Sequence, residues 1–237
     1  ISDINPELIN AYKVIRDNVD ELIAELMSMQ ESFIPLDKEE RKVFYYQARD
    51  EYNNIKINGN ASHNQRKAAL MIFLNRTCFN GLYRVNSKGL FNVPMGDYKN
   101  PIICDKENLL AVSKALKNIE IVCGQFTESE SFIDKHTLVY FDPPYRPLNE
   151  TSNFTSYTET AFDDEQQKRL AAYIDHLSTK GAKIIASNSD PKNNDPNDDF
   201  FDILYSKYKI ERVEASRMIN SNAESRGKIS EILITNF

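Results

Sequence analysis

Residues 142–145, Asp-Pro-Pro-Tyr, combine a carboxylate, two rigid backbone carbonyls and an aromatic ring within four positions. Consecutive prolines fix φ and remove two backbone donors, so the segment excludes a helix and holds its carbonyls in set directions. Asp142 can accept hydrogen bonds, and Tyr145 offers a flat ring for stacking. Together these groups are suited to hold a planar group that carries an amino donor. The alternative is structural, a turn leaving a strand in which Asp142 caps and Tyr145 packs.

The segment follows a short apolar run at residues 137–141, Thr-Leu-Val-Tyr-Phe, whose composition predicts a strand buried on both faces. From about residue 105 onward, predicted strands and helices alternate, which is typical of an α/β fold with a largely parallel sheet. Helices are expected at 105–117, 163–179 and 199–206, and strands at 119–124, 137–141, 182–189, 208–217 and 228–237. The last two strands lack a helix between them, so one should run antiparallel at the edge. Ligands in such sheets sit at the carboxyl ends of the strands, which places residues 142–145 at the active-site edge.

The N-terminal third has a different pattern. Pro6, with Asn5 as its N-cap, begins an apolar stripe that predicts one helix over residues 6–29. A second helix is expected at 63–77, with a loop at 53–62. Alternating aromatic and polar residues around Asn-Ser-Lys-Gly at 86–89 predict a β-hairpin.

The charge of the chain is unevenly distributed. The net charge is −6, yet residues 38–100 hold 11 Lys/Arg and 5 Asp/Glu. This asymmetry indicates that one part faces nucleic acid, although a solvated basic helix face is the alternative. Residues 37–101 also break the alternation of strands and helices. We interpret them as an inserted target-recognition domain, and residues 1–36 and 102–237 as a catalytic domain.

The 237 residues, 41% of them hydrophobic, are enough to form a large core. Three cysteines follow no CxxC spacing, and three histidines lack ligand spacing. We therefore expect reduced thiols in a cytoplasmic protein, and neither a disulfide framework nor a metal site. No apolar stretch approaches a membrane span of about 18 residues, and no signal peptide is visible, so no membrane partner is expected.

Four stretches together carry a family resemblance: "DINPELI" (3–9), "RTCFNGLYRVNSKGLFNVPMGDYKNP" (76–101), "FDPPYRPLNETSNFTSYTETAF" (141–162) and "SRGKISEILITNF" (225–237). Over essentially its whole length the chain resembles the Dam-type DNA adenine-N6 methyltransferases, especially the DpnII-type modification enzymes. The resemblance implies a Rossmann-like methyltransferase sheet with an inserted helical and β-hairpin DNA-recognition module. It also implies S-adenosylmethionine as cofactor and double-stranded DNA as partner.

The resemblance assigns roles to the candidate site residues. Asp142 and the Pro143 carbonyl, within the catalytic set Asp142, Pro143, Pro144 and Tyr145, would accept the N6 protons of a flipped adenine, and Tyr145 would stack on the base. The implied donor-binding residues are Asp3, Gln125, Phe126 and Asp142. Asp3 matches a residue that binds the ribose hydroxyls. Gln125 departs from the family, which usually has an acid before the aromatic. The implied reaction is a direct displacement without a metal.

For DNA, the resemblance implies that the hairpin at 79–98 reads GATC. Arg84 would fork onto guanine O6 and N7, Leu82 and Pro94 would contact thymine methyls, and Phe79 with Asn80 would fill the gap left by the flipped base. The implied DNA-binding residues are Arg76, Phe79, Asn80, Leu82, Arg84, Pro94, Tyr98, Asn153 and Ser156, with further backbone contacts from Arg217, Asn222 and Arg226.

The resemblance also exposes a difference. The family begins with a strand and a Gly-rich loop that cradles the methionine part of the donor, and none of the seven glycines here makes that motif. We therefore expect that a first strand–loop–helix unit of roughly 30 residues is absent from this sequence. The intact protein is expected to be an enzyme, and this chain by itself to be weak or inactive. Two alternatives stay open: a non-catalytic GATC-binding fragment, and an amino-methyltransferase acting on RNA or protein. A restriction–modification role with a cognate endonuclease, a housekeeping or phage role, and the oligomeric state also stay open.

Overall fold

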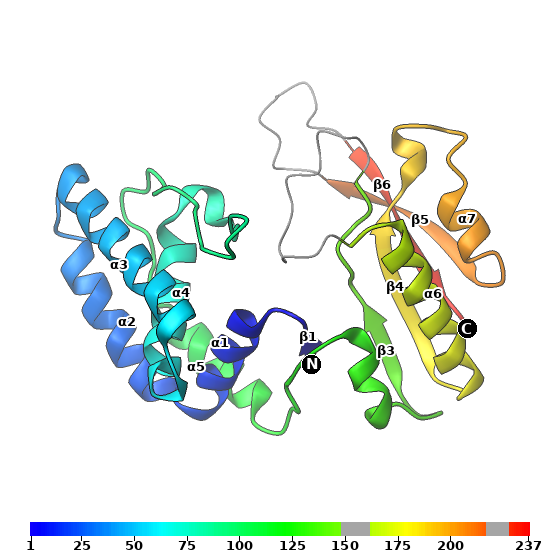
Figure 1. The fold of residues 1–237 in the computed structure, drawn as a ribbon, viewed down its shortest axis with the longest axis horizontal. Coiled ribbons are helices and arrows are strands. Elements are labelled where there is room, and N and C mark those ends of the chain that lie inside the picture. The colour runs from blue at the N-terminus through cyan, green and yellow to red at the C-terminus, as the bar shows by residue number, and fades with distance from the viewer. Residues whose placement is uncertain (148–161, 217–227) are drawn as a thin grey trace. The chain divides into compact units, whose positions relative to one another are not determined.

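The computed structural model describes residues 1–147, 162–216 and 228–237. They form two compact units, one comprising Ile1–Phe126 and the other beginning at Thr127 (Figure 1). The mixture of helices and sheets confirms the predicted α/β class. Among the described residues, none of the helices has both the length and the apolar character that crossing a membrane requires.

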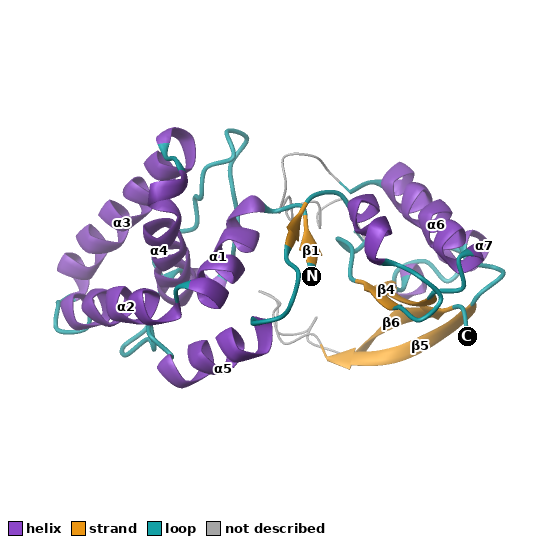
Figure 2. Cartoon of the chain, turned by 90° about the horizontal axis from the view of Figure 1, so that it is seen from below, coloured by secondary structure: helices purple, strands orange, loops and turns teal. Residues whose placement is uncertain are grey.

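The first unit is mainly helical, and its helices pack together (Figure 2). They are α1 (Pro6–Asp17), α2 (Val19–Phe33), α3 (Lys38–Asn58), α4 (Asn64–Thr77) and α5 (Lys106–Leu116), with 3-10 turns at Ala61–His63 and Phe79–Gly81. Pro6 begins α1, and the Asn5 side chain accepts from the amides of Glu7 and Leu8, as the sequence predicts.

Two helical predictions need correction. The single helix expected over 6–29 is broken at Asn18, whose φ of −139° and ψ of 42° are not helical. The loop expected at 53–62 is wrong for residues 53–58, because α3 continues to Asn58. Tyr45, Ala48 and Tyr52 lie at helical spacing on the buried face of α3, and their burial stabilises a helix whose other faces are polar.

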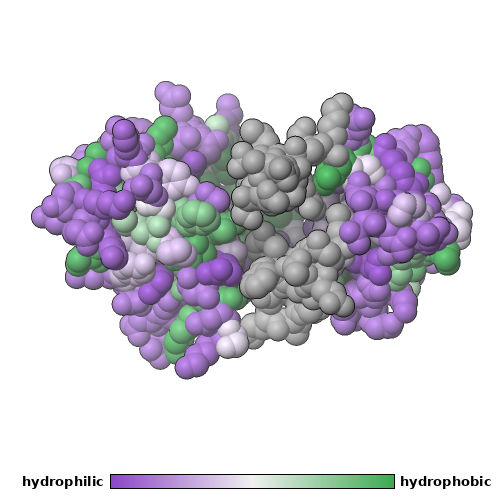
Figure 3. All heavy atoms as spheres, turned by 90° about the horizontal axis from the view of Figure 1, so that it is seen from above, coloured by the Kyte–Doolittle hydropathy of each residue, from purple (hydrophilic) through white to green (hydrophobic). Residues whose placement is uncertain are grey.

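Large apolar and aromatic side chains fill the core between these helices. Leu22 and Leu26 of α2 and Leu70 of α4 are fully buried. The rings of Phe33 and Phe73 meet edge to face with centroids 5.3 Å apart, a favourable arrangement for aromatic pairs. Positions on α2, α3 and α4 therefore share one core, and the outer surface that Figure 3 shows is largely hydrophilic.

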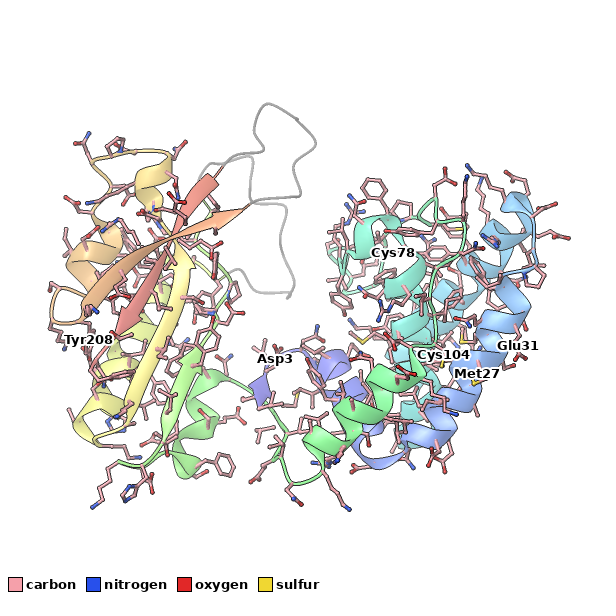
Figure 4. All side chains as sticks on the ribbon, turned by 180° about the vertical axis from the view of Figure 1, so that it is seen from behind. Asp3, Met27, Glu31, Cys78, Cys104 and Tyr208 are labelled. Atoms are coloured by element: carbon pink, nitrogen blue, oxygen red, sulfur yellow. The ribbon has the colours of Figure 1, made fainter. Side chains whose placement is uncertain are left out.

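The first unit also contains a minimal parallel sheet. Strand β1 (Ser2–Asp3) pairs with β2 (Val122–Cys123), with Ser2 opposite Val122 and Asp3 opposite Cys123. The carboxyl ends of both strands therefore lie side by side, and Asp3 comes at the end of β1, just before α1 (Figure 4).

The second unit is a four-stranded sheet in the order β3-β4-β6-β5. Its strands are β3 (Leu138–Phe141), β4 (Lys183–Ser189), β5 (Lys209–Ser216) and β6 (Lys228–Thr235). Its helices are α6 (Asp164–Thr179) and α7 (Phe200–Leu204), with 3-10 turns at Phe126–Phe132 and Pro191–Asn193. Helix α6 ends before Gly181, whose φ of 85° is the left-handed conformation that glycine adopts readily. Strands β3 and β4 are parallel, so their carboxyl ends meet at one edge.

Strand positions differ from expectation in two respects. The antiparallel strand of the final pair is β6, but it lies inside the sheet, between β4 and β5. Buried Ile232 and Ile234 suit β6 to that place, whereas exposed charges on β5 suit an edge. The prediction that residues 137–141 are buried on both faces is wrong for this unit, because Leu138 and Tyr140 are 58% and 59% exposed. Strand β3 is itself an edge strand, with Phe141 packed against Tyr173 of α6.

The boundary between the compact units lies near residue 126, whereas the predicted functional division separates 37–101 from 1–36 and 102–237. That functional division stays a prediction, because compactness alone does not assign a role to a segment.

Candidate functional site

Asp142 follows the last residue of β3, at the carboxyl edge of the sheet. Its side chain is exposed, and its Oδ1 atom accepts a hydrogen bond of 3.2 Å from the Ser187 hydroxyl of β4. The Ser187 hydroxyl also lies 3.0 Å from the hydroxyl of Tyr140. The neighbouring strand thus orients one carboxylate oxygen and leaves the other, Oδ2, available to a ligand.

The two proline carbonyls have different surroundings. Gln167, fully buried in α6, donates from Nε2 to the Pro144 carbonyl at 3.1 Å. Its Oε1 accepts from Nδ2 of Asn188 at 3.1 Å, so both ends of this buried amide are satisfied. In the described part of the chain the Pro143 carbonyl accepts no hydrogen bond, and it is therefore the proline carbonyl that remains for a ligand.

Arg146 anchors the far end of the loop. Its amide donates to Asn188 Oδ1 at 2.9 Å, and its carbonyl accepts from the Ser189 hydroxyl at 2.6 Å. The guanidinium forms a bidentate pair with Asp164, at 2.8 and 3.1 Å, and reaches Asp198 at 2.7 Å. The loop is consequently held by its backbone and its side chain at once.

Charge and packing reinforce this anchor. The guanidinium carbon of Arg146 lies 4.4 Å from the ring centroid of Phe200, within the range of a cation–π contact. The hydrogen bond to Asp164 raises the pKa of Arg146 and outweighs the opposing effect of burial, with Asp198 adding to the rise. Burial would raise the pKa of Asp198, but hydrogen bonds from Arg146 and from the Phe200 amide lower it overall.

Tyr145, the aromatic residue of the loop, is half-buried. Its hydroxyl lies 3.4 Å from Glu231 Oε2 of β6. Burial raises the pKa of Tyr145, and the nearby charges of Glu231 and Asp142 add to the rise. The phenol therefore stays protonated at neutral pH, and its ring is held at the same strand edge as Asp142.

The predicted donor-binding residues Asp3, Gln125 and Phe126 come together at the ends of β1 and β2. The Gly124 amide donates to the carbonyl of Asp3 at 3.0 Å, which aligns residues 124–126 with Asp3. Oδ1 of Asp3 accepts from the Asn5 amide at 2.6 Å. Gln125 is exposed and Phe126 is half-buried.

The segment predicted to read DNA is a hairpin, as expected. Antiparallel bridges join Val85 to Phe91 and Cys78 to Met95. The turn at 86–89 is closed by a hydrogen bond of 2.8 Å from the Gly89 amide to the Asn86 carbonyl, with Gly89 at a φ of 70°. Regular strand pairing is sparse here, so other contacts must fix the second arm.

Helix α3 supplies those contacts. The side-chain amide of Asn53 donates to the Phe91 carbonyl at 3.0 Å and accepts from the Phe91 amide at 2.9 Å. The Tyr45 hydroxyl donates to the Val93 carbonyl at 2.9 Å. Since Phe91 and Val93 are also buried in the core, the second arm is held through both its backbone and its side chains.

Alternation along the two arms separates an inner from an outer face. Leu82, Arg84 and Pro94 are exposed, and Asn92 is half-buried beside Arg84. The structure thus brings three of the predicted DNA-contacting residues to one face. We call Leu82, Arg84, Asn92 and Pro94 the outer face of the hairpin.

Phe79 and Asn80 lie at the base of the hairpin. Asn80 and Gly81 have φ values of 55° and 61°, a left-handed pair that asparagine and glycine tolerate better than other residues. The Phe79 ring is 51% exposed. Tyr98, 42% exposed, lies beyond the second arm. A Cβ at Gly96 would come within 2.5 Å of the Tyr98 ring and 2.7 Å of the Cys78 carbonyl, so glycine is required at this close approach.

The basic residues of the segment 38–100 include two groups with different surroundings. Arg66 pairs with Glu51 and Glu25, Lys67 pairs with Glu7, and Arg41 donates to backbone carbonyls, so these three cations serve the fold. Another group has no acidic partner within 4.0 Å among the described residues and surrounds the hairpin: Arg76, Arg84, Lys88 and Lys99. This second group is the part of the surplus suited to a polyanion.

Some predicted residues lie outside the described residues: Asn153, Ser156, Arg217, Asn222 and Arg226. Sequence reasoning missed the residues that hold the loop at 142–146. The buried polar run Ser187-Asn188-Ser189 at the end of β4 is the signal that would have revealed them, because a buried strand rarely ends on three polar residues without partners for them.

Comparison with known proteins gives a consistent picture. Residues 1–219 match the model of the D12 class N6 adenine-specific DNA methyltransferases. The type II methyltransferase M.MjaIII of Methanocaldococcus jannaschii is 50% identical over 100% of this chain and 79% of its own. The type II methyltransferase M1.LlaDCHI of Lactococcus lactis subsp. cremoris is 41% identical over 100% of this chain and 78% of its own length. The DNA adenine methylase of Escherichia coli is 34% identical over 98% of this chain and 77% of its own length. The chain therefore belongs to the D12 class of N6 adenine-specific DNA methyltransferases.

Proposed function

We propose that this protein transfers a methyl group from S-adenosylmethionine to N6 of an adenine flipped out of double-stranded DNA, within the sequence GATC. The observation that carries the proposal is the loop at 142–146, which hydrogen bonds to β4 and α6 hold in place. In this loop Oδ2 of Asp142 and the Pro143 carbonyl accept no hydrogen bond from the described residues, whereas Oδ1 of Asp142 accepts from Ser187 and the Pro144 carbonyl accepts from Gln167. Membership of an adenine-specific family supports the reaction, and the residues of the hairpin support GATC as the target.

The loop residues perform the chemistry by positioning. An adenine inside a duplex is out of reach, so the base must be flipped, at a cost of a few kcal/mol. Oδ2 of Asp142 and the Pro143 carbonyl then accept hydrogen bonds from the two N–H groups of N6, and the Tyr145 ring stacks on the base. Held in this way, the nitrogen lone pair faces the reacting carbon. Methylated N6 would have one proton to lose, and exposed Asp142 could accept this proton from N6 and pass it to water.

S-adenosylmethionine, when bound, supplies an electrophilic methyl group on a sulfonium. The ends of β1 and β2 fit its nucleoside part, because a carboxylate suits ribose hydroxyls and Phe126 offers an apolar wall for a purine. Oδ1 of Asp3 is engaged by the Asn5 amide, so Oδ2 is the oxygen that would accept from ribose. Gln125 would accept from the adenine amino group through its amide oxygen.

We assign DNA reading to the segment 37–101 and its hairpin. Arg84 reads a guanine, Leu82 and Pro94 contact thymine methyls, and Phe79 with Asn80 occupies the gap left by the flipped base. Arg76 and Tyr98 make supporting contacts to the duplex, and Asn153 and Ser156 hold phosphates. A cognate restriction endonuclease as partner belongs to the same proposal, which two relatives named type II methyltransferases support.

The test combines labelled S-adenosylmethionine with duplexes that contain GATC or a one-base variant of it, followed by digestion to nucleosides. We expect label in N6-methyladenine, and only from GATC duplexes. Asp142→Ala should abolish transfer and leave DNA binding intact, because its side chain is exposed and accepts one hydrogen bond among the described residues, from Ser187. Label in cytosine, RNA or protein glutamine would contradict the proposal, and equal labelling of the one-base variants would contradict GATC.

A further inference from the structure

The two side chains at the centre of the outer face, Arg84 and Asn92, are joined by more than the hairpin's backbone. The Asn92 amide donates to the Arg84 carbonyl at 3.1 Å, as paired residues of a hairpin do. In addition, Nε of Arg84 donates to Oδ1 of Asn92 at 2.8 Å, and Nη2 lies 3.4 Å from the Asn92 carbonyl. Both contacts fall on the same edge of the guanidinium.

A guanidinium has two edges that can present a pair of parallel N–H groups, the Nε/Nη2 edge and the Nη1/Nη2 edge. Asn92 takes the first of these. The second makes no hydrogen bond within the described residues, and Arg84 has no acidic partner there. An exposed guanidinium that is fixed along one edge and free along the other is prepared for a bidentate acceptor.

We propose that Asn92 is a positioning residue for target reading, which occupies the Nε/Nη2 edge of Arg84 so that guanine O6 and N7 meet the Nη1/Nη2 edge. This inference rests on the proposed function, since it assumes that Arg84 reads a guanine. The inference adds Asn92 to the residues proposed to read DNA. It also specifies that Arg84 contacts the guanine through its Nη1/Nη2 edge and not through its Nε/Nη2 edge. It also leaves Nδ2 of Asn92 as a donor beside the contacted base pair.

The test uses GATC duplexes in which one guanine at a time is replaced by 7-deazaguanine, which lacks only the N7 acceptor. For the wild-type protein we expect one of the replacements to reduce DNA affinity and kcat/KM about 10-fold, the loss of one bond of a bidentate pair. In Asn92→Leu, whose side chain has a similar branched shape and no acceptor, the same replacement should cost less than about 3-fold, because Nε of Arg84 has lost the Oδ1 atom that orients the guanidinium. Asn92→Asp keeps the Oδ1 acceptor and should restore the 10-fold penalty, although its charge weakens binding to every duplex.

Asn86→Ala is the matched control. Asn86 stabilises the turn of the same hairpin by accepting from the amides of Lys88 and Leu90, at 2.9 and 3.1 Å, and does not contact Arg84. It should weaken all duplexes alike and keep the 7-deazaguanine penalty. A penalty that persists in Asn92→Leu, or that vanishes equally in Asn86→Ala, would overturn the inference. Absence of any preference for GATC in the wild-type protein would instead overturn the proposed function.

Discussion

Gln167, in the first turns of α6, donates to the carbonyl of Pro144 at 3.1 Å from a position that is fully buried. This contact assigns different tasks to two consecutive prolines. The Pro144 carbonyl holds the loop on the helix, and in the proposed function the Pro143 carbonyl is the one that accepts from the substrate. The loop therefore depends on a residue that lies outside the motif itself.

Gln167→Leu should reduce kcat about 10- to 100-fold with little change in affinity for DNA, because the Pro143 carbonyl loses its set direction. The free energy of unfolding should also fall by about 1–3 kcal/mol, since Asn188 Nδ2 and the Pro144 carbonyl lose their partner. Gln166→Leu, one position earlier on the same helix, should leave kcat unchanged, because among the described residues its Oε1 accepts from Arg169 and from no residue of the loop. Steady-state kinetics with saturating DNA would separate the two. An equal loss of kcat in both variants would show that the rate depends on the integrity of α6 and not on the hydrogen bond from Gln167 to Pro144.

Ser187→Ala should reduce kcat about 5-fold without unfolding the protein. The substitution removes the donor to Oδ1 of Asp142, and one hydrogen bond of this kind contributes about 1 kcal/mol. Ser187→Thr retains the hydroxyl and should restore most of the rate. Single-turnover methylation of a GATC duplex measures the effect. A Thr variant as slow as the Ala variant would contradict an orienting role for the hydroxyl.

Arg146→Gln should lower the free energy of unfolding by about 2 kcal/mol at pH 7, because Asp164 and Asp198 lose a partly buried partner. The effect should depend on pH. The pKa of Asp198 is lowered from its ordinary value of 3.8, so its stabilisation is complete above that value and is lost as the pH falls through the folded-state pKa. The difference between wild type and variant should thus stay constant from pH 8 to about pH 5 and shrink below the ordinary pKa.

Urea denaturation followed by circular dichroism at each pH measures this difference. Lys168→Gln is the control, because Lys168 forms an exposed pair with Glu165 on the same helix, and exposed pairs contribute little. A difference for Arg146→Gln that widened below pH 4 would have the wrong sign for a carboxylate with a lowered pKa.

Asn53→Ala should loosen the second arm of the hairpin, because one side chain satisfies both the amide and the carbonyl of Phe91. We expect faster hydrogen exchange of the amides at 85–93, and weaker binding to GATC duplexes by about 10-fold. Asn54→Ala is a suitable control, since its side chain is exposed and, within the described part of the chain, its hydrogen bond is to Asn58 on the same helix. Unchanged exchange at 85–93 would mean that burial of Phe91 and Val93 alone holds the arm.

Asp3→Asn should weaken the binding of S-adenosylmethionine about 10-fold while keeping the fold, because the amide oxygen can still accept from the Asn5 amide. A neutral oxygen is a poorer acceptor for ribose hydroxyls than a carboxylate. Isothermal titration calorimetry measures the affinity. Identical affinities for Asp3→Asn and wild type would remove Asp3 from the donor site.

Local signals in the sequence predicted much of this molecule correctly. Pro6 after Asn5, the turn at 86–89 and the apolar run before Asp142 each depend on neighbouring residues, and each is found where it was predicted. The break at Asn18 was not predictable in this way, because the apolar stripes of α1 and α2 continue with the same period on either side of it.

Long-range contacts explain the remaining differences. Helix α3 is strongly charged, and only its contacts with the core at Tyr45 and Tyr52 reveal that it continues to Asn58. Similarly, no spacing in the sequence relates Gln167 to Pro144 or Asn53 to Phe91, since these pairs are 23 and 38 residues apart. The places of the motif segments in the fold were therefore predictable, whereas the residues that hold these segments were not.

The hairpin has a consequence for how such proteins diversify. Its inward side chains and backbone are held by α3 and the core, so substitutions at Leu82, Arg84, Asn92 and Pro94 leave the folding free energy almost untouched. Selection can then try new combinations at these four positions while the protein remains folded. The loop at 142–146, in contrast, is held by its own buried partners and tolerates little change. Under the proposed assignment of DNA reading to this face, a lineage of these enzymes can change its target sequence and keep the reaction it performs.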